Sequence, residues 1–156
     1  MFEVLVFMFK NYFTNQDMLD DATLDDVAME QELSAAGFEK DDILGAFGWF
    51  NEMKSMFSTP AFDYSHEKTA IRVFTPSETK IINTDSLGFL IFLQQAKVIN
   101  DVERDLIVDR AMALNTSLGI EEMRWITMMA LWSQGRDKDY SFVEDALFNP
   151  RGSTLQ

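Results

Sequence analysis

The sequence predicts an all-α protein of about seven helices, a bundle of two helical subdomains with one short extended segment. Three observations support this fold class. Apolar residues recur every three or four positions through most of the 156 residues, as they do on one face of a helix. Residues typical of helix ends separate these apolar runs. Only residues 70–74 alternate as a strand does, and one strand is not stable alone.

Three predicted helices form an acidic N-terminal subdomain over residues 1–56. Residues 2–13 are apolar around most of the helix circumference, which indicates a central core helix. Thr23, with Asp26 three residues later, resembles a capping box and starts the second helix. Gly37 is typical of the left-handed residue that ends a helix. The third helix follows after a short turn and begins with two aspartates, which favour a first turn.

A linker is predicted over residues 57–68, which contain Pro60 and few periodic apolar positions. The C-terminal helical subdomain then covers residues 69–150, and residues 151–156 are expected to form a frayed tail. Residues 70–74 are interpreted as an extended segment packed on helices, with a hairpin to residues 80–83 as the alternative.

The helices of the C-terminal subdomain are predicted from their end signals and their apolar spacing. Thr75-Pro76-Ser77-Glu78 has the order of an N-cap, a first-position proline and a capping glutamate. Further helices are expected over 87–99, from Asn100 or Asp101 to Leu114, over 120–133 and over 141–148.

The composition argues against several kinds of site. Without cysteine, the chain has no disulfide, no thiolate metal site and no cysteine nucleophile. His66, the only histidine, stands between Ser65 and Glu67, and such sequence neighbours cannot form a catalytic relay. The acidic pairs lack the spacing of a calcium-binding loop. We therefore expect no catalytic residue, no metal and no cofactor.

No segment reads as an export signal or a membrane span. The apolar N-terminus lacks a basic region and a small-residue cleavage site, and it contains Glu3 and Lys10. We therefore expect a cytoplasmic protein that does not contact membranes.

Acidic residues dominate the charge, which is −13 overall. Residues 1–65 hold 13 acidic and 3 basic residues, a net charge of −10. Such a surface repels phosphate backbones and anionic lipid. Direct nucleic-acid binding is therefore disfavoured, and an unknown protein partner is the expected ligand.

Two groups of residues are candidate contact sites. Residues 123–132 are apolar nearly all round, so they form either a fully buried helix or one that presents Trp and Met to a partner. The candidate partner interface consists of Trp125, Met128, Met129 and Trp132. For the alternative function, contact with nucleic acid, the candidate basic face consists of Lys68, Arg72, Lys80, Arg104 and Arg110.

The order of motifs along the chain resembles the bacterial Smg family from Met1 to about Phe148. The one departure is Leu87, where the family usually has Arg before Gly-Phe, and this removes a cation. The motifs that carry the resemblance are MFEVLVFMFKNY, LSAAGFEKDDILGAFGWF, IRVFTPSE, GFLIFLQQ, VINDVERDLIVDRAMAL and MRWITMMALW.

The resemblance implies a mostly helical cytoplasmic bacterial protein without an established activity. It also implies gene neighbours in DNA processing, topoisomerase I and translation, which assign no residue a role. We interpret the chain as a non-catalytic protein-interaction or regulatory module. The alternative is an accessory factor in a DNA-processing, topoisomerase-related or translation-related process.

Overall fold

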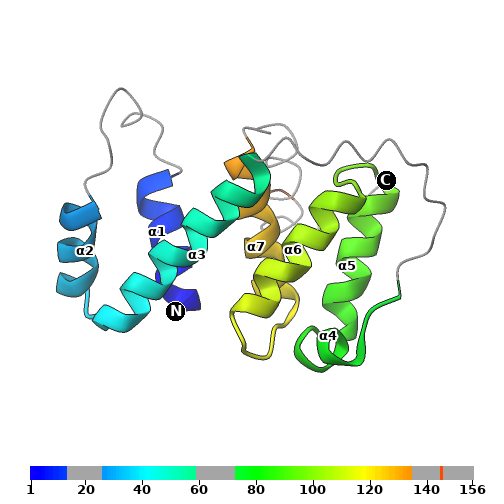
Figure 1. Cartoon of the computed structure of the whole chain (residues 1–156), viewed down its shortest axis with the longest axis horizontal. Helices are drawn as coiled ribbons and strands as arrows, with labels where there is room; N and C mark the ends of the chain where they lie inside the picture. The colour runs from blue at the N-terminus through cyan, green and yellow to red at the C-terminus, as the bar shows by residue number, and fades with distance from the viewer. Residues whose placement is uncertain (14–25, 59–72, 135–144, 146–156) are drawn as a thin grey trace. The chain divides into compact units, whose positions relative to one another are not determined.

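The computed structural model describes residues 1–13, 26–58, 73–134 and 145, and within these ranges it contains seven α-helices and no strand. The predicted all-α class is confirmed (Figure 1). None of the helices in these ranges is both long and apolar enough to cross a membrane. The helices are α1 (Phe2–Met8), α2 (Asp26–Ala35), α3 (Lys40–Ser58), α4 (Pro76–Ile81), α5 (Thr84–Gln95), α6 (Asp101–Ala113) and α7 (Ile120–Ser133).

The chain divides into two compact units, Met1–Glu52 and Met53–Gln156. The boundary falls within α3, which runs on to Ser58 and so includes the first two residues of the predicted linker. The rest of that linker lies outside the described residues. So do the predicted tail and the predicted helix over 141–148, except Asp145, which is helical.

In the first unit, α1 continues as a π-helical turn over Phe9–Phe13. One face of α1 is buried through Val4, Leu5 and Met8, which agrees with the core helix predicted from the sequence. The amino group of Met1 lies 3.3 Å from a carboxylate oxygen of Asp42 in the first turn of α3. This ion pair joins the start of α1 to the start of α3.

The turn after α2 follows the prediction made from Gly37. Gly37 has a φ of +99°, and its N–H donates to the carbonyl of Ser34 at 3.1 Å. The N–H of Phe38 donates to the carbonyl of Leu33 at 3.2 Å, which completes a Schellman ending. The Phe38 ring then lies 5.4 Å from the Phe7 ring, edge to face. The left-handed glycine thus turns the chain so that Phe38 packs on α1.

In the second unit, α4 and α6 begin at the capping residues that the sequence predicts. The Thr75 hydroxyl accepts from the N–H of Glu78 at 3.2 Å, and the Glu78 carboxylate accepts from the N–H of Thr75 at 2.9 Å. Asn100 and Glu103 form the same reciprocal pair at the start of α6, at 2.9 and 3.2 Å. Both are capping boxes, in which two otherwise unpaired N–H groups gain acceptors.

A two-residue parallel bridge joins the α4–α5 junction to the loop before α7. Ile82 and Leu118 form this bridge and are both buried. The N–H of Leu118 donates to the carbonyl of Ile81 at 2.9 Å. Residues 80 and 81 are helical, so the described part of the chain offers no hairpin between residues 80–83 and 73–74. The rest of the predicted extended segment, 70–72, lies outside the described residues.

Helix α5 ends four residues earlier than its apolar pattern predicts. The expected helix over 87–99 is wrong at its C-terminus, because α5 stops at Gln95 and Lys97 has a φ of +60°. The N–H of Val98 donates to the carbonyl of Leu93 at 2.9 Å, and that of Lys97 donates to Gln94 at 3.0 Å. This is a second Schellman ending, with lysine at the position where glycine is usual. Val98 and Ile99 are buried outside the helix.

We predict that Lys97→Gly raises the free energy of unfolding by about 0.5–1 kcal/mol, because a left-handed backbone strains any residue with a Cβ. The side chain of Lys97 is exposed, so its removal costs little packing. Urea unfolding monitored by circular dichroism measures the change. The matched control is Asn115→Gly, at a φ of +49°. Asparagine tolerates this region, so the control gains less, and an equal gain from both would contradict the explanation.

Candidate functional site

The predicted interface residues on α7 do not share one environment. Met128 and Met129 have 1% and 0% of their surface exposed, so they belong to the core. Trp125 and Trp132 are half-buried. Most of α7 is therefore enclosed, as in the fully buried alternative, and of the four predicted interface residues only the two tryptophans keep some surface for a partner.

The predicted basic face is not assembled as an exposed group among the described residues. Arg104 and Arg110 are 7% and 5% exposed, and each is paired with an aspartate of its own helix. Lys80 is exposed at the end of α4. Lys68 and Arg72 lie outside the described residues. The two arginines of α6 thus have their charge offset by carboxylates instead of offering it to a phosphate.

Helix α5 carries an apolar surface that the sequence prediction missed. Ile91 and Phe92 are 42% and 52% exposed, although Leu90 and Leu93 beside them are buried. Gly88 is exposed on the same face, three and four positions earlier, and a Cβ built on it would meet nothing within 4 Å. We call Gly88, Ile91 and Phe92 the α5 apolar face. The helix is apolar on both its buried and its open sides.

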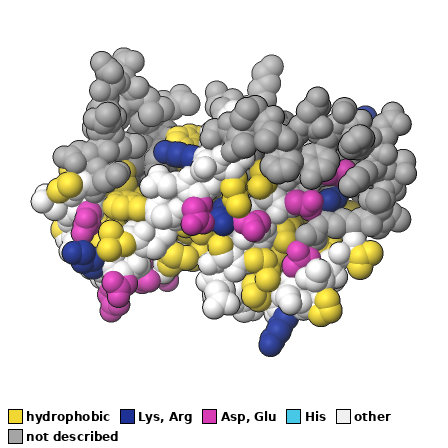
Figure 2. Space-filling view, in the orientation of Figure 1, with side chains coloured by type: hydrophobic (Ala, Val, Ile, Leu, Met, Phe, Trp, Pro, Cys, Tyr) yellow, Lys and Arg dark blue, Asp and Glu magenta, His cyan; other side chains and the backbone are white. Residues whose placement is uncertain are grey.

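An acidic row follows the neighbouring helix. Asp101, Asp105 and Asp109 stand at intervals of four residues on α6, which places them on one side of the helix. Their side chains are 51%, 52% and 52% exposed. We call these three residues the α6 acidic row. In Figure 2, acidic side chains alternate with hydrophobic ones over the part of the molecule where Figure 1 shows α6.

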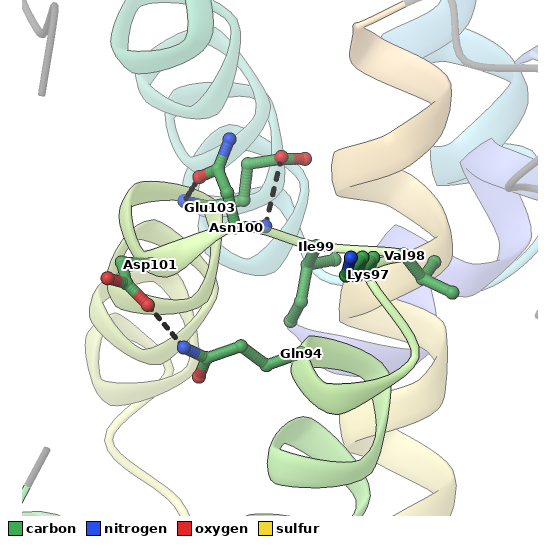
Figure 3. A pocket seen from close by; sticks show the side chains of 7 residues that line it. All are labelled: Gln94, Lys97, Val98, Ile99, Asn100, Asp101 and Glu103. Carbon is green, nitrogen blue, oxygen red and sulfur yellow. Dashed lines mark hydrogen bonds between the residues drawn. The ribbon is translucent and has the colours of Figure 1, made fainter. Parts of the chain in front are cut away.

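A hydrogen-bond network holds the acidic row beside α5. The buried Arg104 donates from Nη1 to the Gln94 side-chain carbonyl at 2.6 Å and from Nε to an Asp105 oxygen at 3.2 Å. The Gln94 amide donates to Asp101 (Figure 3). Arg104 Nη1 also lies 3.4 Å from the same Asp101 oxygen. One guanidinium thus links a side chain of α5 to two residues of the acidic row.

A pocket of about 420 Å³, open to solvent, lies at the turn between α5 and α6. Asp101 accepts from Gln94, and Glu103 accepts from the Asn100 N–H and, at 3.2 Å, from the Gln134 amide. The side chains of Gln94, Asp101 and Glu103 around this pocket thus link α5, α6 and the residue that follows α7. The lining residues, seen in Figure 3, are Gln94, Lys97, Val98, Ile99, Asn100, Asp101 and Glu103.

The other border of α5 carries a cation. The Arg124 guanidinium of α7 lies 5.7 Å from the centre of the Phe89 ring, within the range of a cation–π contact. Its Nε is buried and has no hydrogen-bond partner within the described part of the chain, and the same holds for the Ser86 hydroxyl. Phe89 and Gln94 are five positions apart, so they lie on different sides of α5. The apolar face is therefore bordered by Arg124 on one side and by aspartates on the other.

The α5 apolar face and the α6 acidic row expose two kinds of group. Across the residues that the structure describes, no three histidine, aspartate or glutamate side chains converge as metal ligands do. The side chains that the surface leaves exposed are apolar or acidic. A partner can contact such groups by burying apolar area and by placing cations near the carboxylates.

Comparison with known proteins identifies the family of this chain. A family model described as "Protein of unknown function (DUF494)" matches residues 1–156. A "Protein Smg homolog" of Methylobacillus flagellatus is 47% identical over 156 residues, covering 99% of each chain. The chain belongs to the bacterial Smg family.

Other Smg relatives match over similar lengths. The "Protein Smg homolog" of Herminiimonas arsenicoxydans is 34% identical over 95% of this chain and 92% of its own. The "Protein Smg" of Sodalis glossinidius is 32% identical over 95% of each chain. The resemblance predicted from the motifs is thus confirmed. No solved structure matches this Smg chain.

The pairing of α5 with α6 gives a first stability prediction. We expect Arg104→Ala to lower the free energy of unfolding by about 2 kcal/mol, because it removes the donor that Gln94 and Asp105 share and a cation that both Asp101 and Asp105 contact. Thermal and urea unfolding measure this. Lys80→Ala, at an exposed position, is the control and should stay within about 0.5 kcal/mol of the parent. A loss below that size for Arg104→Ala would contradict the network's role.

Two neighbouring residues of α5 give a second prediction. Phe92→Ser should lower the free energy of unfolding by only about 1 kcal/mol, because half of that side chain is already in water. Leu93→Ala should cost about 2–5 kcal/mol, because Leu93 is 1% exposed and leaves a cavity. Denaturant titrations of both variants test this. Similar losses at both positions would show that Phe92 belongs to the core.

Proposed function

We propose that this Smg chain is a non-catalytic protein-interaction module that binds its partner on the α5 apolar face. The observation that carries the proposal is the exposure of Ile91 and Phe92, 42% and 52%, side by side on a helix whose other face is buried. Single exposed apolar residues are ordinary on protein surfaces. Two large ones in sequence, next to an exposed glycine on the same face, form a continuous patch, and such patches are typical of contact sites.

Burial of this patch would be worth a useful amount of binding energy. Fully burying one large apolar side chain contributes about 1.5–3 kcal/mol, so the exposed halves of Ile91 and Phe92 together offer about 1.5–3 kcal/mol. Aromatic residues are also enriched among the few positions that dominate binding. The half-buried Trp125 and Trp132 of α7 remain candidate contacts from the sequence prediction, whereas the core residues Met128 and Met129 do not face a partner.

The nucleic-acid alternative has less support. A phosphate-binding face needs accessible cations, but Arg104 and Arg110 are buried and paired with aspartates. Asp101, Asp105 and Asp109 occupy the exposed side of the same helix and would repel phosphate. A protein partner is therefore the better match to this surface. Within this proposal the chain acts in the cytoplasm.

Site-specific photo-crosslinking in living bacteria tests the proposal. A benzoylphenylalanine at position 92 of the full-length chain should trap discrete protein adducts, because a bound partner would cover that side chain. The adducts should persist when the lysate is treated with nuclease before purification. The control carries the same probe at Val27, which is 60% exposed on α2, and should trap none of these adducts.

Two results would count against the proposed function. Equal adducts at positions 27 and 92 would mean that the α5 face has no special affinity. Adducts at position 92 that disappear with nuclease would favour the nucleic-acid alternative.

A further inference from the structure

We infer that the partner segment is a basic amphipathic helix, whose apolar side lies on the α5 apolar face and whose Lys and Arg side chains lie along the α6 acidic row. This inference rests on the proposed function and adds the chemistry of the partner. It follows from three features of the surface: its shape, the position of its charges and the repulsion it would exert on other occupants.

The shape of the α5 apolar face fits a helix. Gly88, Ile91 and Phe92 have the i, i+3 and i+4 spacing of one helix face, and Gln95 continues the same row. Gly88 has open space where a side chain would stand. A residue without a side chain lets a second backbone approach closely, and helices pack at about 8–10 Å between axes. The large side chains at 91 and 92 then lie beside the docked helix.

The acidic row lies along the edge where such a helix would expose its charges. Gln94 accepts a hydrogen bond from Arg104 and donates one to Asp101, and these bonds place the N-terminal part of the row directly beside α5. Asp101 and Asp109 are eight positions apart, which is about 12 Å along a helix axis. Cations at i and i+4 of a docked helix have the spacing of Asp101 and Asp105, whereas α6 diverges from α5 towards its C-terminal end in Figure 1, so Asp109 lies farther from a helix docked on α5.

The arginines of α6 offset this attraction only in part, because two cations stand against three carboxylates. Arg104 and Arg110 are buried under the row, while the three aspartates are about half exposed. A docked partner therefore meets the carboxylates first. Cations brought to this edge also lose less solvation than they would in a buried pair, so they steer and orient the partner more than they add affinity.

The same charges disfavour other occupants. A second copy of this chain would bring one acidic row against another, and each copy has a net charge of −13. Nucleic acids and anionic lipid surfaces would be repelled for the same reason. An amphipathic helix with acidic residues could bury apolar area on the α5 apolar face, but its carboxylates would be repelled by the α6 acidic row. Only a segment that is both apolar and basic satisfies the two halves of the surface.

A synthetic peptide tests the partner chemistry on the full-length chain. The probe is an amphipathic peptide of about 18 residues with a Leu and Ala face and with Lys and Arg along one edge of that face, long enough to form five helical turns. The matched peptide has Glu in place of every Lys and Arg. Binding is measured by fluorescence anisotropy, and the contact residues are mapped by NMR. We expect the basic peptide to bind at least tenfold more tightly than the acidic one, and to shift the resonances of Gly88, Ile91 and Phe92.

Two pairs of variants separate docking at this surface from attraction to the overall charge. Phe92→Glu should weaken binding of the basic peptide at least tenfold, whereas Val27→Glu should leave it within about twofold. Asp105→Asn with Asp109→Asn keeps hydrogen-bond acceptors for the arginines and removes two charges. This pair should weaken binding about fivefold and flatten its salt dependence. Its control, Glu39→Gln with Asp41→Asn on exposed positions before and in α3, removes the same charge.

Each contrary result has a defined meaning. Equal weakening by the two charge-removing pairs, or equal binding of the basic and acidic peptides, would overturn the inference. So would a dimer, detected by light scattering in high salt, that Phe92→Glu dissociates. If the probe at position 92 traps a protein in cells but the basic peptide does not bind, the proposed function stands and the partner chemistry is wrong. If the probe traps nothing, the function itself fails.

Discussion

The side of the second unit formed by α5 and α6 depends on the burial of one guanidinium. Arg104 is 7% exposed, and a buried cation is stable only when oxygen acceptors surround it. The acceptors come from two helices, Gln94 of α5 and the aspartates of α6. This requirement sets the position of α5 relative to α6. It also orients α6 so that its three aspartates remain about half exposed above the buried arginine.

The turn between these helices meets a related constraint. The Gln94 side chain must reach Arg104 on α6, which follows α5 closely in the chain. Helix α5 therefore ends at the next residue, and the chain turns back to Asn100, the N-cap of α6. Lysine accepts a left-handed backbone at position 97 to make this possible. The cost of that conformation is small beside the capping box and the buried Val98 and Ile99 that follow.

The helix boundaries that depend on local chemistry could be predicted from the sequence. Thr75 with Glu78, Asn100 at the start of α6 and Gly37 after α2 each act through contacts within six residues. The end of α5 could not be predicted, because Lys97 is not a residue that signals a left-handed turn. Nor could the π-helical turn at Phe9–Phe13, since its sequence fits an α-helix equally well. The family could be predicted from motif order, which is independent of the packing.

The candidate surface was harder to predict because composition does not distinguish covered from open helices. Helices α5 and α7 are both apolar on nearly every side, and the prediction chose α7 for its tryptophans and methionines. In the structure α7 packs against α5 and α6 and has seven buried residues, whereas α5 buries three and leaves Ile91 and Phe92 in solvent. Likewise, the sequence suggested that Arg104 contributes to a basic surface. In the structure Arg104 is buried beneath Asp105, so the exposed side chain at that point is acidic.

The asymmetry of the surface bears on specificity. An apolar patch alone binds many partners with little discrimination, since the hydrophobic effect has no direction. Here the patch lies between Arg124, which rests on Phe89, and the aspartates held by Gln94 and Arg104. Because the two borders differ in charge, rolling a docked helix about its own axis, or reversing its direction, would bring like charges together on at least one side. Buried aliphatic and aromatic contacts then supply the affinity, while the borders restrict the orientation in which that affinity is realised.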